Sequence, residues 1–197
     1  STVRQHVLPV ERHGDLGPRF SGTHAYRGLI PRQQLEDALK RQGADERLSK
    51  VPQMLLGRDR HILTFPVKGG SVINVVAFAT DRALSRPLVA EPDPWVEEVS
   101  PETLLAEFDD WGNATRAILG CIERPTRWAL HDIPTLPHYH ERRVLLIGDA
   151  AHAMLPHQGA GAGQALEDAW VLSRLLGDST CDRSRVTEVL SMFDYLR

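Results

Sequence analysis

Cysteine is scarce in this chain, with only Cys121 and Cys181 among 197 residues. So few thiols exclude a disulfide framework and favour a reducing cytoplasm, although a single Cys121–Cys181 bridge stays open at this point. Long apolar runs are also missing: none approaches the roughly 18 residues of a transmembrane helix, so no membrane partner is expected. The formal net charge is only −3, which gives no reason to expect nucleic acid as a partner.

Several motifs that carry chemistry are absent as well. No strand-like run leads into Gly-x-Gly-x-x-Gly with a later acid, so any dinucleotide must have its adenine end held by residues outside this sequence. There is no His-Glu-x-x-His and no zinc-like thiol spacing, so no metal site is expected, although His138 and His140 alone form a possible chelating pair. The lack of a Gly-x-Ser-x-Gly elbow argues against a hydrolase.

β-branched and aromatic residues predict an antiparallel sheet in the first two thirds of the chain. Strands are expected over 23–30, 61–67 and 71–79, and Lys68-Gly69-Gly70 joins the last two as a hairpin. A short edge strand is expected at 128–130 and a buried strand over 143–147. The Pro-rich, charged stretch 83–101 is expected to be a surface loop.

Apolar residues at helical spacing predict the helices. One begins after Pro31, one or two lie within 101–118 with Ser100 as N-cap, and two lie near the C-terminal end. The first of these last two starts at Gly161 and ends before Gly177, and the second covers 186–196. Antiparallel strands, helices and a final strand–loop–helix unit predict a mixed α/β (α+β) fold.

The most informative stretch begins where the apolar run over 144–147 ends, at Gly148-Asp149-Ala150-Ala151-His152. A loop rich in Pro and Gly follows, with Pro156, His157 and Gly159-Ala160-Gly161, and a helix then carries Glu167-Asp168-Ala169. This order places a carboxylate and bare main-chain N–H groups at the end of a strand. Such a site suits a ligand with hydroxyls and a polar, electron-accepting ring.

This stretch resembles the second flavin-contacting motif of the single-component FAD aromatic hydroxylases. Within that family the chain is most similar to the salicylate hydroxylase group, which has strands like His-Ile-Leu-Thr-Phe-Pro-Val at 61–67 and Asn-Val-Val-Ala-Phe at 74–78. The segments 25–28 and 128–130 also match, so the resemblance covers nearly the whole chain. It implies part of an FAD/NAD(P)-binding fold of the p-hydroxybenzoate hydroxylase type. Residues 1–140 would be a substrate-binding sheet domain with flanking helices, and 141–197 the C-terminal part of the FAD-binding domain.

The resemblance also implies an activity. Family members hydroxylate a small aromatic acid, here salicylate to catechol with loss of carbon dioxide, using FAD, NAD(P)H and O2 through a C4a-hydroperoxyflavin. They begin with a Rossmann unit, so this chain would need a missing N-terminal Rossmann segment to bind FAD well. Two alternatives stay open: another flavoprotein oxidoreductase of the same fold, such as an epoxidase or a different hydroxylase, or a non-catalytic fragment.

Cofactor contacts follow from the resemblance residue by residue. It assigns them to Asp149, Pro156, Gly159, Gly161, Ala162 and Arg4. The matching Asp of the family bonds a ribityl hydroxyl of FAD, whereas the alternative for Asp149 is a turn or cap residue. Glycines let the main chain approach a flat ring, and N–H groups at a helix start favour the negative charge of reduced flavin, although the same glycines also suit a flexible connection.

Three residues correspond to the substrate pocket of salicylate hydroxylase: His61, Arg82 and His157. The guanidinium of Arg82 suits a carboxylate because it donates two parallel hydrogen bonds. His157 is expected to accept the phenol proton, since a neutral imidazole is a base near pH 7, and His61 to orient the substrate. Each also has a structural alternative: His61 as an edge-strand histidine, Arg82 as a solvated loop cation and His157 as a loop histidine.

Overall fold

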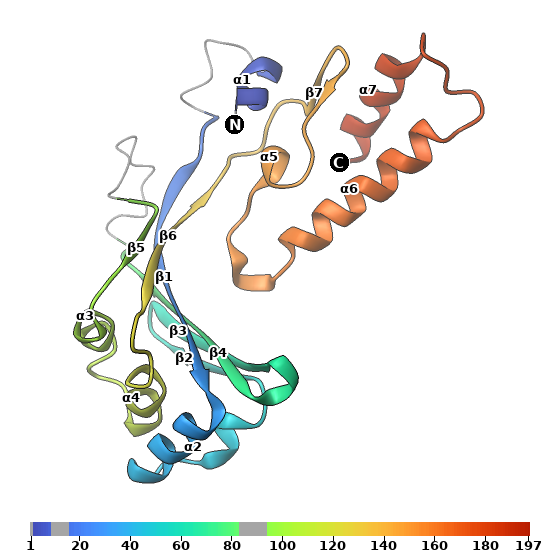
Figure 1. Cartoon of the computed structure of the whole chain (residues 1–197). Helices are drawn as coiled ribbons and strands as arrows, with labels where there is room; N and C mark the ends of the chain where they lie inside the picture. The colour runs from blue at the N-terminus through green and yellow to red at the C-terminus, as the bar shows by residue number, and fades with distance from the viewer. Residues whose placement is uncertain (1, 9–15, 83–93) are drawn as a thin grey trace. The chain divides into compact units, whose positions relative to one another are not determined.

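The computed structural model describes residues 2–8, 16–82 and 94–197 (Figure 1). The chain forms two compact units: Phe20–Leu130, called the sheet unit below, and Ser1–Arg19 with His131–Arg197, called the discontinuous unit. The sequence predicted a single boundary after residue 140, which differs from this division. Residues near the N-terminus group with the last third of the chain because Val7 and Leu16 share an apolar cluster with Leu136 and Leu146.

The sheet unit is built on six strands in the order β2-β3-β4-β1-β6-β5. Their bounds are Arg19–Pro31 for β1, Gln53–Gly57 for β2, Arg60–Val67 for β3, Val72–Thr80 for β4, Val96–Glu98 for β5 and Thr126–Asp132 for β6. The pairs β2–β3, β3–β4, β1–β4 and β5–β6 are antiparallel, and the predicted hairpin at Lys68-Gly69-Gly70 joins β3 to β4. The mixed α/β fold with an antiparallel sheet is therefore confirmed.

In the sheet unit one strand prediction is wrong and two strands were missed. The strand at 128–130 is not an edge strand, because β6 lies between β1 and β5. Neither β2 nor β5 was predicted, and β5 lies inside the stretch expected to be a loop. Residues 83–93 of that predicted loop fall outside the described residues.

The core of the sheet unit lies between the sheet and the helices α2 (Arg32–Arg41), α3 (Pro101–Ala106) and α4 (Asn113–Leu119). Alternation along the strands decides which side chains enter it: on β3, Ile62 and Thr64 are fully buried while their neighbours are only half-buried. Ser100 caps α3 as predicted, accepting a hydrogen bond from the Thr103 N–H at 3.2 Å. The fully buried apolar residues include Ile30, Leu35, Leu39, Ile62, Val75, Leu104, Ile118 and Leu119.

The two ends of the sheet unit lie next to each other. β1 and β6 are hydrogen-bonded neighbours in the sheet, and the Ser21 hydroxyl donates to the Leu130 carbonyl at 2.9 Å. The chain therefore enters and leaves this unit at the same point of the sheet.

The discontinuous unit contains α1 (Thr2–Val7), β7 (His140–Glu141), β8 (Val144–Leu145), α5 (Asp149–His152), α6 (Gly161–Leu176) and α7 (Val186–Leu196). The buried strand predicted over 143–147 is wrong: only two residues form β8, and Ile147 is 41% exposed. Among the described residues β8 pairs only with the two residues of β7, so its ladder of hydrogen bonds is short. Both cysteines are free thiols, so the bridge left open by the sequence does not form.

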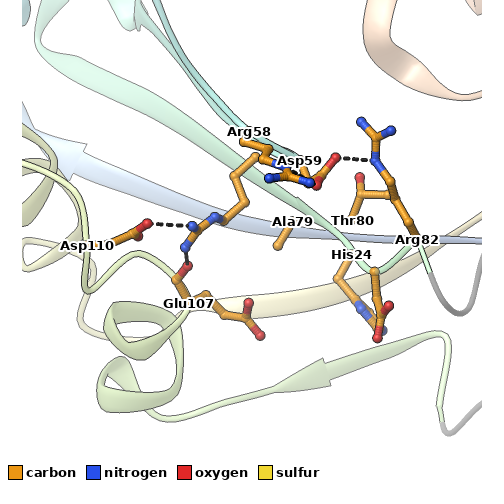
Figure 2. Close-up of a pocket in the computed structure, with 10 residues that line it drawn as sticks. His24, Arg58, Asp59, Ala79, Thr80, Arg82, Glu107 and Asp110 are labelled. Atoms are coloured by element: carbon orange, nitrogen blue, oxygen red, sulfur yellow. Dashed lines mark hydrogen bonds and ion pairs between the residues drawn. The ribbon is translucent and has the colours of Figure 1, made fainter.

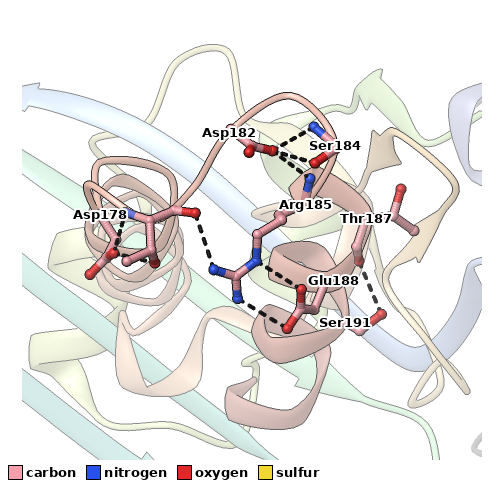
Figure 3. Close-up of polar contacts among 8 residues, drawn as sticks. Asp178, Asp182, Ser184, Arg185, Thr187, Glu188 and Ser191 are labelled. Carbon is pink, nitrogen blue, oxygen red and sulfur yellow. Dashed lines mark hydrogen bonds and ion pairs between the residues drawn. The ribbon is translucent and has the colours of Figure 1, made fainter.

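The long helix α6 has the predicted bounds but not the expected burial. Its apolar stripe is largely exposed, with Leu166 at 72%, and Asp168 is the one buried residue of this fully described helix. Polar contacts hold the turn into α7 (Figure 3): the Asp182 carboxylate accepts the Ser184 N–H at 2.8 Å, and Arg185 pairs with Glu188 at 3.0 Å. None of the described helices is both long and apolar enough to cross a membrane.

Candidate functional site

The Gly148–Asp149 turn is the centre of the candidate site. Gly148 follows β8 with φ 56° and ψ −142°, a left-handed conformation that favours glycine. A Cβ at this position would lie 3.4 Å from the Cβ of Ala165. Asp149 is the next residue and the first of α5, and it is exposed. The turn thus presents a carboxylate at the start of a short helix, as the sequence predicted.

Arg4 reaches this turn from α1. It is only 8% exposed, and its Nε donates to the Ala150 carbonyl at 3.0 Å while an Nη donates to the Asp149 carbonyl at 3.5 Å. Burial lowers the pKa of the Arg4 guanidinium. Its contacts are to the main chain of α5, so Arg4 holds the candidate site in place; a direct contact with FAD remains a prediction.

The loop between α5 and α6 has an open side. Pro156 and His157 lie exposed in a 3-10 turn that ends at Gly159, whose φ is 64°. Cβ atoms added at Gly159, Gly161 or Gly163 would meet no atom within 4 Å. The main chain of this loop can therefore be approached closely by a flat group.

The start of α6 adds a partial positive charge to this open side. Within the described part of the chain, no side chain caps the helix at Ala160, and its first turn contains no acid. Its first N–H groups, at Gly161 and Ala162, are thus left to solvent or to a ligand, and they favour negative charge. A flavin, with ribityl hydroxyls and a ring that becomes anionic on reduction, fits this combination of donors, carboxylate and open space.

A small pocket lies beside α5 but does not suit the ring itself. It has a volume of about 180 Å³ and is lined by residues that include Ile133, Tyr139, His152 and Leu155. Pockets for small-molecule ligands usually have volumes of about 300–1,000 Å³. The glycine loop, rather than this pocket, is the place with room for a tricyclic group.

Asp168 pairs within the fold, as the sequence suggested for Glu167 and Asp168, but its place beside the Gly148 turn was not predicted. Its side chain on α6 is 1% exposed, and its Oδ2 accepts the Gly148 N–H at 2.7 Å. The same oxygen lies 2.7 Å from His152 Nε2, and Oδ1 lies 2.7 Å from Arg197 Nε. The available signal was its helical position, since Asp168 shares a face with the half-buried Ala165 and Leu172.

Arg82 lines a pocket in the sheet unit. The pocket has a volume of about 590 Å³, and its lining includes His24, Arg58 and Thr80 (Figure 2). Arg82 forms an ion pair with Asp59, and its own side chain is 77% exposed. Arg82, which was predicted to bind the substrate carboxylate, therefore lines a pocket. Its guanidinium is paired with the carboxylate of Asp59 in this structure.

His61 does not line this pocket. Its ring stacks on Phe78 across β3 and β4, with 4.3 Å between centroids and 13° between planes. Neighbouring residues of a strand point to opposite faces, so His61 and the pocket-lining Arg60 lie on different faces of the sheet. The pocket lining beside Arg82 therefore does not include His61, and His157 belongs to the discontinuous unit.

Known proteins resemble the chain over its full length. It is 54% identical over all 197 residues to a salicylate hydroxylase from Pseudomonas putida, of which it covers 45%. It is 38% identical over 175 residues to a 6-methylsalicylate 1-monooxygenase from Aspergillus terreus, covering 89% of this chain and 36% of that protein. A solved salicylate hydroxylase substrate complex matches with a TM-score of 0.93 and 46% identity, covering 100% of this chain and 48% of that one.

The chain spans about half the length of the curated salicylate hydroxylases that it matches. The structural match confirms the expected fold, that of the FAD-dependent aromatic hydroxylases. The family model described as "FAD binding domain" matches residues 58–184, which is well over half of the chain. The chain therefore belongs to the FAD binding domain family.

Proposed function

We propose that this chain is part of a flavin-dependent monooxygenase that hydroxylates a small phenolic acid, with salicylate as the first candidate substrate. FAD is the proposed cofactor, and NAD(P)H and O2 are the proposed co-substrates. The observation that carries the proposal is the 54% identity to a salicylate hydroxylase over the whole chain. The Gly148–Asp149 turn beside an open glycine loop supports it independently, because it offers what a flavin requires.

The chain's own residues would hold the cofactor. Asp149 accepts a hydrogen bond from a ribityl hydroxyl, and the N–H groups of Gly161 and Ala162 stabilise negative charge on the ring. Gly159 allows close approach of the main chain, and Pro156 packs against the ring edge. FAD, when bound, supplies hydride acceptance from NAD(P)H and activation of dioxygen.

Three residues are proposed to act on the substrate, each in a different role. Arg82 binds the carboxylate of the phenolic acid, which requires it to exchange its partner Asp59 for the ligand. His157 accepts the proton of the phenol oxygen and so raises the electron density of the aromatic ring. His61 orients the substrate from its stacked position on Phe78.

The test uses a complete protein in which this chain replaces the matching segment of the P. putida relative. We expect it to bind FAD, to change its flavin spectrum on addition of salicylate, and to yield catechol when NAD(P)H and O2 are supplied. Asp149→Ala should weaken FAD binding by about tenfold or more, the usual effect of losing a hydrogen bond to a charged group. An unchanged dissociation constant for FAD would exclude the ribityl role.

The substrate residues are tested separately from the cofactor residues. His157→Ala should slow product formation more than it slows flavin reduction, because the phenol proton matters only to hydroxylation. Arg82→Lys should raise the KM for salicylate, whereas Arg58→Lys, which lines the same pocket with a side chain 95% exposed, serves as the matched control. Equal KM values for the two variants would remove Arg82 from the substrate site.

The alternatives give different results in the same assays. A complete protein that binds FAD and oxidises NAD(P)H but makes no hydroxylated product from phenolic acids would be another flavoprotein oxidoreductase. A colourless protein that FAD does not titrate would support the non-catalytic alternative.

A further inference from the structure

One buried carboxylate connects three segments of the discontinuous unit. Asp168, on α6, accepts the Gly148 N–H, which belongs to the junction between β8 and α5. It also contacts His152, the last residue of α5, and Arg197, which follows α7. Because a side chain that is 1% exposed makes all three contacts, small shifts of any segment would leave a buried charge poorly paired.

The hydrogen bond from the Gly148 N–H to Asp168 helps to fix the main-chain conformation of the turn. The Gly148 carbonyl is already used inside α5, where it accepts the N–H groups of Ala151 and His152 at 2.9 and 3.0 Å. The Gly148 N–H points the other way, to Asp168 Oδ2 at 2.7 Å. With both peptide groups of this residue bonded, the direction in which Asp149 leaves the turn is determined.

The charge state of Asp168 suits this role. Burial disfavours its ionised form, but the Gly148 amide, the contact with His152 and the positive charge of Arg197 together outweigh burial, so its pKa is lowered. An ionised carboxylate only accepts hydrogen bonds, so the His152 ring carries its proton on Nε2. The hydrogen bond with Glu167 and, after it, the negative charge of Asp168 raise the pKa of Arg197.

We propose that Asp168 is a positioning residue for the cofactor: its carboxylate holds the Gly148–Asp149 turn so that Asp149 faces the ribityl chain of FAD. This inference rests on the proposed function, because it requires that Asp149 binds FAD. Asp168 acts through the turn and does not touch the cofactor itself.

The neighbouring acid provides a matched control. Glu167 precedes Asp168 on the same helix and pairs with the same Arg197, at 2.9 Å, but its side chain is 58% exposed and the Gly148 N–H bonds to Asp168 instead. Asp168→Asn and Glu167→Gln each remove one negative charge near Arg197 and change the side-chain shape very little. Only the first of them alters the acceptor of the Gly148 N–H.

The first measurement needs no cofactor. Hydrogen exchange of the Gly148 amide is measured in this chain carrying Asp168→Asn or Glu167→Gln. We expect about tenfold faster exchange in Asp168→Asn and a change below about twofold in Glu167→Gln, since only the first weakens a charge-assisted hydrogen bond. Equal exchange rates in both variants would overturn the structural half of the proposal.

The second measurement is a double-mutant cycle on FAD affinity in the complete protein, with Asp149→Ala, Asp168→Asn and the double variant. If Asp168 acts by placing Asp149, Asp168→Asn weakens FAD binding by about tenfold alone but by less than about twofold when Asp149 is already Ala. If the fold-losses of FAD affinity in the two single variants instead multiply in the double variant, Asp168 acts independently of Asp149 and the proposal is overturned. An unchanged affinity in Asp168→Asn would overturn it as well.

The cycle separates this proposal from the proposed function. If Asp149→Ala leaves FAD affinity unchanged, the ribityl role fails first; if only Asp168→Asn has no effect, the positioning role fails alone. Should Asp168→Asn not fold, as judged by circular dichroism, His152→Ala replaces it in the cycle. Removing that donor loosens the carboxylate, and we expect about threefold weaker FAD binding that again disappears in the Asp149→Ala background.

Discussion

The two units of the chain are held together in different ways. In the sheet unit, helices α2, α3 and α4 share an apolar core with the strands, in which residues such as Leu39 and Ile118 are completely buried. In the discontinuous unit, the longest helix, α6, buries only Asp168 and leaves Leu166 and Trp170 at 72% and 67% exposure. An apolar core packs the helices of the first unit against its sheet, whereas in the second unit a smaller apolar cluster is accompanied by a buried ion network that holds α6.

This difference has a thermodynamic meaning. Apolar burial contributes in proportion to the area removed from water and depends little on pH, whereas a buried carboxylate contributes only while its partners stay in place and it stays ionised. The two units should therefore respond differently to the same kind of substitution and to opposite extremes of pH.

The largest expected effect is a cavity in the sheet unit. Leu39→Ala removes a fully buried side chain from α2 and should lower the free energy of unfolding by about 2–5 kcal/mol. Leu166→Ala, on the exposed side of α6, should change it by less than about 0.5 kcal/mol. Urea unfolding followed by circular dichroism measures both; similar losses would mean that α6 is packed as tightly as α2.

A smaller effect is expected in alkali, from Tyr26 of the sheet unit. Its hydroxyl donates to Glu107 at 3.3 Å, and burial together with the negative charge of Glu107 raises the pKa of Tyr26 to about 12. The unfolded chain loses this proton near pH 10, so between pH 10 and about 12 the unfolded state binds fewer protons and stability falls as pH rises. Urea unfolding across this range should show the fall, and Tyr26→Phe should reduce it.

In acid, the discontinuous unit should be affected through Asp168. Its pKa is lowered because three partners outweigh burial, so the stability that it contributes is present above the unfolded value of 3.8 and is lost as pH falls through the lower folded value. We expect the protection of the Gly148 amide, which is its exchange rate compared with that of an unstructured amide at the same pH, to fall in that range while amides of β3 and β4 stay protected. An equal loss of protection in both units would contradict the assignment.

The smallest expected effect is a gain in stability at the glycine loop. Gly163→Ala places a methyl group where no atom lies within 4 Å, and replacing a glycine in a helix by alanine contributes up to about 1 kcal/mol. In the complete protein the same methyl group should weaken FAD binding, because it occupies the open side of the loop. Gly28→Ala in the sheet unit is the opposite case, since its Cβ would lie 2.5 Å from an Ile122 side-chain carbon and should destabilise. If Gly163→Ala leaves FAD affinity unchanged, the flavin ring does not bind at the open side of this loop.

Local signals in the sequence predicted most of the elements. Alternation gave the β3–β4 hairpin, the Ser100 cap marked α3, and helical spacing with a closing glycine gave α6. Each of these depends on residues close together in the chain. The position of β6 inside the sheet, the short β8 and the missed β2 depend on which strands pair over long distances, and a short segment carries little information about that.

The candidate site shows the same division. The Gly148–Asp149 turn and the glycine loop were predictable because their function depends on adjacent residues. The partners of Asp168 were not predicted, because they lie 20, 16 and 29 positions away and meet it only in the folded unit. The exposure of the α6 stripe also escaped prediction, since periodicity indicates an apolar face but not whether anything covers it.

The hydrogen bond between Ser21 and Leu130 has an evolutionary and practical consequence. A segment whose first and last residues touch can be exchanged as a cassette, because its removal leaves a gap that a very short linker closes. Substituting residues 20–130 by the corresponding segment of a relative would change the pocket beside Arg82 while leaving the turn at Gly148 in its native sequence. Selection can act in the same manner, diversifying what such proteins recognise without rebuilding the part that carries the Gly-Asp motif.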